Sequence, residues 1–131
     1  MKYMLQIYSA PDGWGHPIFL RAPEAATMSG DEREAMIGQL DALLTEITES
    51  GELVGAEALA DPVTARTVRV RDGVPATTDG PFSEAKEQLA GYFVVDCESP
   101  ERATEIAARF PDARFAAVEV RPIMDLSGQE M

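Results

Sequence analysis

The chain of 131 residues has one cysteine, one histidine and one tryptophan. It is therefore poor in cysteine and histidine, the residue types that build disulfides and many metal centres. A single cysteine cannot form an internal disulfide, and one histidine without a cysteine cluster does not supply the ligands of a zinc site. The carboxylates lack the spacing of a calcium-binding loop. These absences predict a protein that holds neither a metal nor a cofactor.

Basic residues are also scarce, because 11 of them stand against 23 acidic ones and the net charge is −12. Binding to nucleic acid depends on Lys and Arg that neutralise phosphates, so direct nucleic-acid binding is not expected. No apolar run approaches the roughly 20 residues of a membrane span. The first residues do not resemble a secretion signal either. We therefore expect a cytoplasmic protein without a membrane partner.

Motifs of covalent and phosphate chemistry are missing too. The sequence contains no glycine-rich dinucleotide or phosphate loop and no serine in a nucleophile elbow. Nucleophilic catalysis is not supported, and whether the protein is an enzyme stays open at this point.

Hydrophobic residues make up 45% of the chain, enough for the core of a single domain over residues 1–131, with residues 125–131 as a frayed tail. Alternating apolar residues predict strands at 2–8, 52–59, 90–97 and 114–121. Residues 65–78 predict a β-hairpin, because Asp72-Gly73 suits a type I′ turn. Residues 10–28 have no clear period and predict a long loop.

Two helices are predicted from their start signals. Ser29 and Glu32 fit a capping box ahead of apolar residues at helical spacing, and Gly51 follows as a cap. Ser99-Pro100 opens the second helix with an N-cap and a first-position proline. The predicted fold class is α+β: a ferredoxin-like βαββαβ order with an inserted hairpin.

The first strand is apolar on both alternations. Tyr3, Leu5 and Ile7 lie on one face, and Met4 and Tyr8 lie on the other. Helices on a single face would leave the second set bare. The expected partner is a second copy of the chain that covers this second face and so forms a homodimer.

The stretch Asp79-Gly80-Pro81-Phe82 has two interpretations. Asp, Gly and Pro are turn residues, so the motif can be a capped turn before the strand at 90–97. Alternatively, Asp79 acts as a general base in a cleft, next to charged and aromatic side chains. The residues alone leave both interpretations open.

The stretch DGPFSEAKEQLAGYF closely resembles the signature of the DGPF proteins (DGPFAETKE-domain proteins) of the YCII-related superfamily. MKYMLQIY, GELVGAEAL, TARTVRVRDG and AAVEVRPIMD extend the resemblance over nearly the whole chain, except residues 10–28. Ser83 and Ala85 replace the usual Ala and Thr of the signature. The resemblance implies a ferredoxin-like dimeric α+β barrel and a bacterial origin. It also implies a link of some members to sigma factors of the extracytoplasmic-function class.

The wider superfamily is described as enzyme-like, with a proposed His–Asp pair in a cleft, and the only histidine here is His16. The candidate catalytic residues are Asp79, chosen for its place beside the Gly-Pro turn and charged side chains, and His16, the single imidazole. The candidate ligand-binding residues are Tyr8, Trp14, Phe82, Glu84, Lys86 and Tyr92. One hypothesis is a dimer with a cleft for a small molecule between the sheet and residues 10–28, possessing or lacking enzymatic activity. The alternative is a non-catalytic regulatory or protein-interaction module of sigma-factor-dependent transcription.

Overall fold

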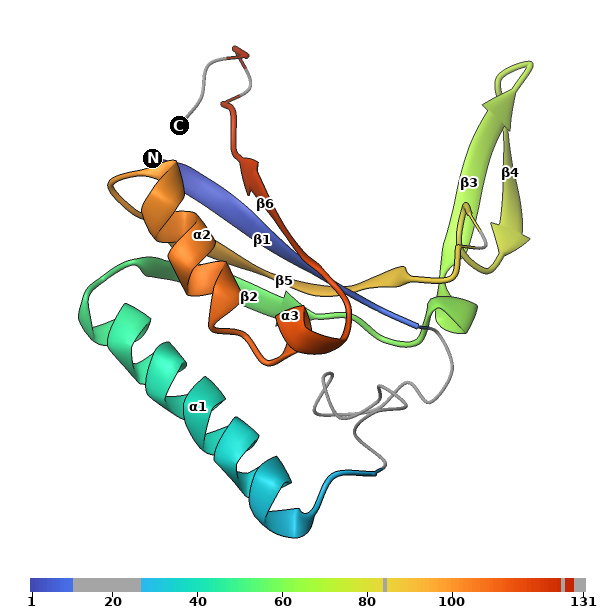
Figure 1. Ribbon diagram of the computed structural model, residues 1–131. Coiled ribbons are helices and arrows are strands. Elements are labelled where there is room, and N and C mark those ends of the chain that lie inside the picture. The colour runs from blue at the N-terminus through green and yellow to red at the C-terminus, as the bar shows by residue number, and fades with distance from the viewer. Residues whose placement is uncertain (11–26, 84, 126, 129–131) are drawn as a thin grey trace.

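The structure, a computed structural model, describes residues 1–10, 27–83, 85–125 and 127–128 (Figure 1). Its elements follow the order that the sequence predicts, with a 3-10 helix added before the hairpin and a short helix added before the last strand. In chain order they are β1 (Lys2–Ser9), α1 (Gly30–Glu49), β2 (Leu53–Ala58), the 3-10 helix η3 (Pro62–Thr64), β3 (Arg66–Arg71), β4 (Val74–Asp79), β5 (Gln88–Asp96), α2 (Pro100–Ala108), α3 (Asp112–Phe115) and β6 (Val118–Pro122).

Strands β2, β5, β1 and β6 form an antiparallel sheet in that order. The first strand is central, because Leu5 lies opposite Phe93 of β5 and opposite Val120 of β6. With α1 and α2 packed on one face, this order is the ferredoxin-like arrangement. The α+β fold class predicted from the sequence is confirmed.

The core lies between this sheet and the helices. Tyr3, Leu5 and Ile7 are buried, and they share one cluster with Leu43 and Ile47 of α1. Helix α2 and the turn after it add Ala103, Ile106, Ala107 and Phe110, and the end of β5 adds Val95 and the adjacent Cys97. The opposite alternation of β1, which includes Met4 and Tyr8, is only half-buried. One face of the sheet therefore has a helix layer, and we call the other the open face.

Both predicted helix starts are confirmed. The Ser29 hydroxyl accepts a hydrogen bond from the Glu32 amide at 3.1 Å, and the Ser99 hydroxyl accepts one from the Arg102 amide at 3.1 Å. Each bond satisfies an amide that has no partner within its helix. Gly51 follows α1 with φ of 81°, a left-handed conformation that glycine adopts without steric cost.

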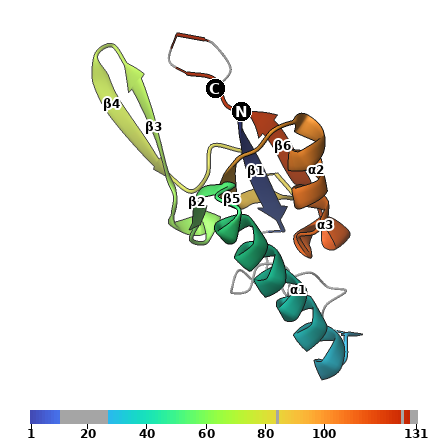
Figure 2. The same ribbon diagram turned by 90° about the vertical axis from the view of Figure 1, so that its left-hand side faces the viewer.

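Strands β3 and β4 form a separate two-stranded sheet, residues 66–79, which we call the arm. Its turn has Asp72 at φ 52° and Gly73 at φ 75°, as the predicted type I′ hairpin turn requires. The arm stands away from the four-stranded sheet (Figure 1). A perpendicular view shows it on the side of that sheet opposite to α2 and α3 (Figure 2).

The last strand differs from the prediction. We expected it to begin at residue 114, but residues 112–115 form α3 and β6 begins at Val118. Pro111, read from the sequence as the stop after the second helix, lies in a right-handed helical conformation and leads directly into this extra turn. Apolar alternation in RFAAVEVR therefore misplaced the strand start by four residues.

Most of the predicted loop over residues 10–28 lies outside the described residues. Within the described part of the chain, no helix is long and apolar enough to cross a membrane.

Candidate binding site at the base of the arm

The chain enters the arm through a rigid turn. Asp61 caps the 3-10 helix η3, because its carboxylate accepts a hydrogen bond from the Val63 amide at 3.0 Å. The Thr64 hydroxyl donates to the Asp61 carbonyl at 2.7 Å. With φ of Pro62 restricted by its ring, this short segment holds one side of the arm's base in place.

The chain leaves the arm through the DGPF motif. Gly80 has φ of 94°, which a residue with a side chain rarely adopts. Its amide donates to the Ala65 carbonyl at 2.7 Å, and its carbonyl accepts from the Thr67 hydroxyl at 3.1 Å. The motif is therefore a turn, as one of the two interpretations had it, and these bonds fasten it to the entry side of the arm.

Between these two turns lies a hollow of about 410 Å³. Segments far apart in the sequence line it: Asp61, Pro62, Val63, Asp79, Gly80, Pro81, Ala85 and Gln88. The volume is within the range of about 300–1,000 Å³ of small-molecule sites, and the lining is mostly apolar with a few polar groups, as such sites usually are.

Asp79 differs from the other polar residues of the hollow. Asp61 is engaged as a cap, and the Gln88 amide donates to the Ser83 carbonyl at 2.8 Å and the Ala85 carbonyl at 3.3 Å. The Asp79 carboxylate, in contrast, has no hydrogen bond or ion pair within the described part of the chain. The capping role considered for this carboxylate does not occur there, and Asp79 is exposed.

The other predicted site residues divide into three groups. Tyr8 and Tyr92 lie on the open face, where the register places Gln6 opposite Tyr92 and Tyr8 opposite Leu89. Phe82 and Lys86 are exposed near the arm and do not line the hollow. His16, Trp14 and Glu84 lie outside the described residues. The hollow thus brings the Asp79-Gly80-Pro81 part of the motif together with residues of η3 and with Ala85 and Gln88, which sequence patterns did not single out.

Gln6 marks the middle of the open face, flanked by Tyr92 and by Glu119 of β6. Its side-chain oxygen is shielded from solvent and, within the described residues, has no hydrogen-bond donor. A buried acceptor without a donor costs roughly 1–3 kcal/mol. A molecule that covers the open face with a donor group would remove this cost.

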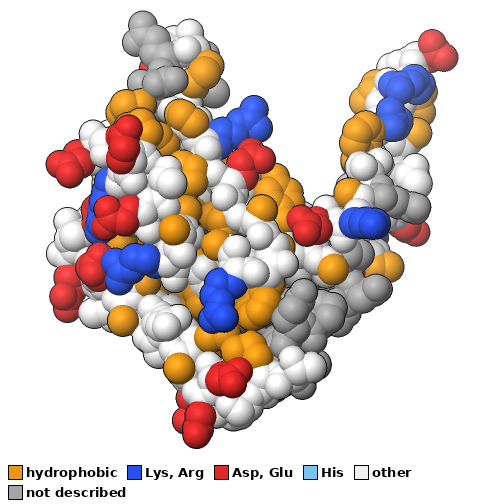
Figure 3. Space-filling view, in the orientation of Figure 1, with side chains coloured by type: hydrophobic (Ala, Val, Ile, Leu, Met, Phe, Trp, Pro, Cys, Tyr) orange, Lys and Arg blue, Asp and Glu red, His pale blue; other side chains and the backbone are white. Residues whose placement is uncertain are grey.

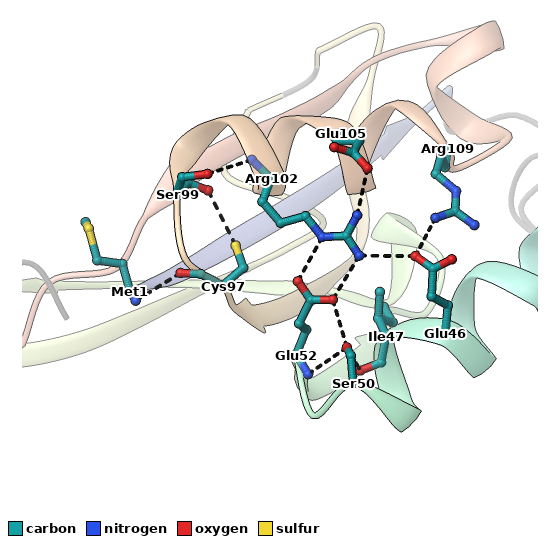
Figure 4. A network of polar contacts seen from close by, with 10 residues as sticks. All are labelled: Met1, Glu46, Ile47, Ser50, Glu52, Cys97, Ser99, Arg102, Glu105 and Arg109. Atoms are coloured by element: carbon teal, nitrogen blue, oxygen red, sulfur yellow. Dashed lines mark hydrogen bonds and ion pairs between the residues drawn. The ribbon is translucent and has the colours of Figure 1, made fainter.

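A second polar cluster, which sequence reasoning missed, joins α2 to α1 and β2 (Figure 4). The Arg102 guanidinium donates two hydrogen bonds of 2.9 Å to the Glu52 carboxylate, one to Glu46 at 3.1 Å and one to Glu105 at 2.7 Å. Arg109 donates to Glu46 at 2.6 Å. Apart from the local pair of Arg102 with Glu105, the partners in this cluster are 50 to 63 residues apart in sequence, so no local pattern could reveal the cluster.

This cluster shifts the titration of its members. The hydrogen bonds from Arg102, followed by the Ser50 hydroxyl bond, lower the pKa of Glu52 to about 2, although burial acts in the opposite direction. Hydrogen bonds from Arg109 and Arg102 also lower the pKa of Glu46. The carboxylates therefore stay ionised well into acid, and the cluster serves to hold the helix layer together.

The single cysteine is a core residue. Cys97 is buried in the main apolar cluster, and burial raises the pKa of its thiol. A thiol with a raised pKa forms little thiolate at neutral pH, so it is a poor nucleophile. No group of three or more His, Cys, Asp or Glu in the described ranges is arranged to hold a metal ion.

Comparison with known proteins bears on the whole chain. A family model described as the YCII-related domain matches residues 1–127. The chain belongs to the YCII-related family. A relative from Rhizobium meliloti (strain 1021), named as an uncharacterised protein, is 34% identical over 97 residues, which cover 72% of this YCII-related chain and 78% of the relative.

Proposed function

We propose that this YCII-related protein is a homodimer of the DGPF subset that binds a small organic molecule in the hollow at the base of the arm. The observation that carries the proposal is the position of Asp79 at a mostly apolar hollow of about 410 Å³, with its carboxylate unused by the described residues. A carboxylate in such a place favours a ligand with an apolar body and a hydrogen-bond donor or a cationic group.

An enzymatic form of this proposal gives Asp79 a role in proton transfer. The carboxylate would accept a proton from the bound molecule and return it to another atom of that molecule, as in isomerisation, or to the departing group, as in elimination. The binding proposal does not depend on this step.

The homodimer rests on the open face. Its half-buried side chains include Met4 and Tyr8, and the shielded Gln6 oxygen lacks a donor in the described residues. An antiparallel sheet that packs its bare face on a second copy buries apolar groups and supplies new polar partners. Sedimentation of the protein at micromolar concentration tests the homodimer, and a monomer that persists at about 100 µM contradicts it.

The ligand is tested by a thermal-shift screen of small organic molecules, followed by binding titrations of the strongest hit to two matched variants. A hit at about 100 times its dissociation constant raises stability by about 2.7 kcal/mol. Asp79→Asn is expected to weaken the binding of that hit at least tenfold. Asp72→Asn removes the same charge at the tip of the arm, outside the hollow, and should change the binding less than twofold.

Two results contradict the binding proposal. One is a broad library in which no compound stabilises the wild-type protein. The other is a hit that binds Asp79→Asn as tightly as it binds the wild type, because this places the ligand elsewhere.

The charge distribution favours a second candidate function, a regulatory module that contacts another protein, such as a sigma factor. Acidic side chains gather over the helix layer (Figure 3), among them the exposed Glu34, Asp41 and Glu49 of α1 and Glu101 and Glu105 of α2. Such a surface attracts a basic protein face at a rate that falls as salt is added. Capture of a partner at low salt that is lost at high salt would support this candidate; no captured protein at low salt would contradict it.

A further inference from the structure

The arm presents an apolar face that nothing among the described residues covers. Val68 lies opposite Thr77 and Val70 opposite Pro75, so these four side chains share one face of the two-stranded sheet. Val68 is 59% exposed and Val70 is 57% exposed. An isolated two-stranded hairpin in water is marginally stable at best. Exposed valines in a row on such a hairpin therefore indicate a surface that docks.

The base of the arm fixes the direction in which it projects. The hydrogen bonds of Gly80 to Ala65 and Thr67 fasten both strands to one another at the base. The Arg69 guanidinium lies over the Phe82 ring, 4.9 Å from its centroid, on the opposite face from Val68. A cation over an aromatic ring is attracted by the ring electrons. The arm is thus held at its root while its valine face stays bare.

Position favours a second copy of this chain as the molecule that covers the valine face. The arm stands on the open-face side of the four-stranded sheet, away from α2 and α3 (Figure 2). A second copy that covers the open face, as proposed above, lies on that same side. The arm root also borders the hollow that contains Asp79. A second copy seated against the arm therefore also lies next to the hollow.

Charge favours the same occupant. The arm contains three arginines and two aspartates, a net charge of +1, within a chain of net charge −12, which leaves −13 on the other residues. Basic and apolar side chains share the arm in the space-filling view (Figure 3). A weakly basic arm is attracted to an acidic body of another copy, whereas two acidic bodies alone repel one another.

We propose that the arm is a clasp between two copies of this chain, with the valine face of each arm packed on the other copy beside its hollow. The proposal rests on the homodimer of the proposed function and adds a surface and a site to it. Each ligand hollow would then be bordered by residues of both copies, so dimerisation and ligand binding are coupled.

Two single substitutions on opposite faces of the arm test the clasp. Val70→Asp places a carboxylate on the valine face, and Ala76→Asp places the same group on the face that bears Arg69. Both positions are exposed, so neither variant disturbs the core. Val70→Asp is expected to raise the dimer dissociation constant at least tenfold, measured by sedimentation equilibrium. Ala76→Asp is expected to change it less than threefold.

The outcomes separate the clasp from the homodimer. A wild-type dimer that dissociates equally in both variants, or in neither, overturns the clasp and leaves the homodimer and its ligand hollow standing. A wild-type protein that stays monomeric overturns both. Loss of an interaction with a different protein in Val70→Asp, without a change in the dimer, assigns the arm to that protein and also overturns the clasp.

Discussion

The four-stranded sheet and the arm are built from similar strands, yet only the sheet has a helix layer on one of its faces. Val95 of β5 is fully buried between the sheet and the helices, whereas Val74 of β4 is 63% exposed. The sheet's strands come from distant parts of the chain, and the arm's strands are joined by a two-residue turn. The sheet therefore depends on tertiary packing, and the arm depends on its turn, its root and whatever docks on it.

The largest expected effect separates the two regions directly. Val95→Ala should lower the free energy of unfolding by about 2 to 3 kcal/mol, because it removes buried carbon atoms and leaves a cavity. Val74→Ala makes the same chemical change on an exposed face of the arm and should cost less than about 0.5 kcal/mol. Urea unfolding of both variants measures these changes, and an equal loss in the free energy of unfolding would contradict the assignment of core and arm.

The next effect is specific to the helix layer and depends on pH. Glu52 has its pKa lowered from about 4.5 to about 2, so its ion pair with Arg102 stabilises the fold above pH 4.5. That stability should be lost as the pH falls from 4.5 towards 2. Arg102→Met should lower stability by about 2 kcal/mol at pH 7 and should flatten the acid dependence in that window.

Arg121 provides the control for this substitution. Its side chain is 73% exposed, and its ion pair with Glu119 is 3.9 Å long. Arg121→Met should change the stability by less than about 0.5 kcal/mol. Unfolding by guanidinium chloride between pH 2 and pH 7 measures the stability of both variants. If the stability of Arg102→Met runs parallel to that of the wild type over this pH range, the ion pair does not act as described.

The smallest effect concerns glycine in the two regions. Gly73→Ala forces a side chain into φ of 75° at the arm turn and should destabilise the arm by about 1 kcal/mol. Hydrogen exchange at the Arg69 and Ala76 amides, which occupy a hydrogen-bonded pair of the arm, should accelerate about fivefold, with no change at Leu5. Gly38→Ala lies in α1, where an added carbon meets open space, and should instead stabilise the protein by roughly 0.5–1 kcal/mol. If the Gly→Ala substitution changed the stability in the same direction at both positions, the contrast between them would be contradicted.

The elements that the sequence predicted well have local causes. Ser29 and Ser99 each accept a hydrogen bond from the amide three residues further along and so cap the helix that follows. The pair Asp72-Gly73 has the conformation of the hairpin turn. The errors arose where a local pattern misleads or is absent. Pro111 opens α3 where it was expected only to end a helix.

The sequence predicted one residue of the candidate site, but it did not predict where the site lies or which other residues line it. Asp79 stood out because it begins a turn motif, and it lines the hollow. Asp61 and Gln88 meet it only because η3 and the start of β5 converge on the root of the arm, which depends on the tertiary fold. Arg102 and Glu52 are 50 residues apart and illustrate the same limit.

The central position of β1 has a consequence for the order in which the elements fold. Lys2 pairs with Asp96, and Tyr3 pairs with Pro122, so both neighbours of β1 come from segments far along the chain. Helix α1 and the arm can form early, because their contacts are local, while β1 waits for these distant segments. The closing of the sheet is therefore a late step of folding. Such long-range pairing predicts refolding that is slower than that of a helical bundle of equal length, which stopped-flow fluorescence of the tyrosines can measure.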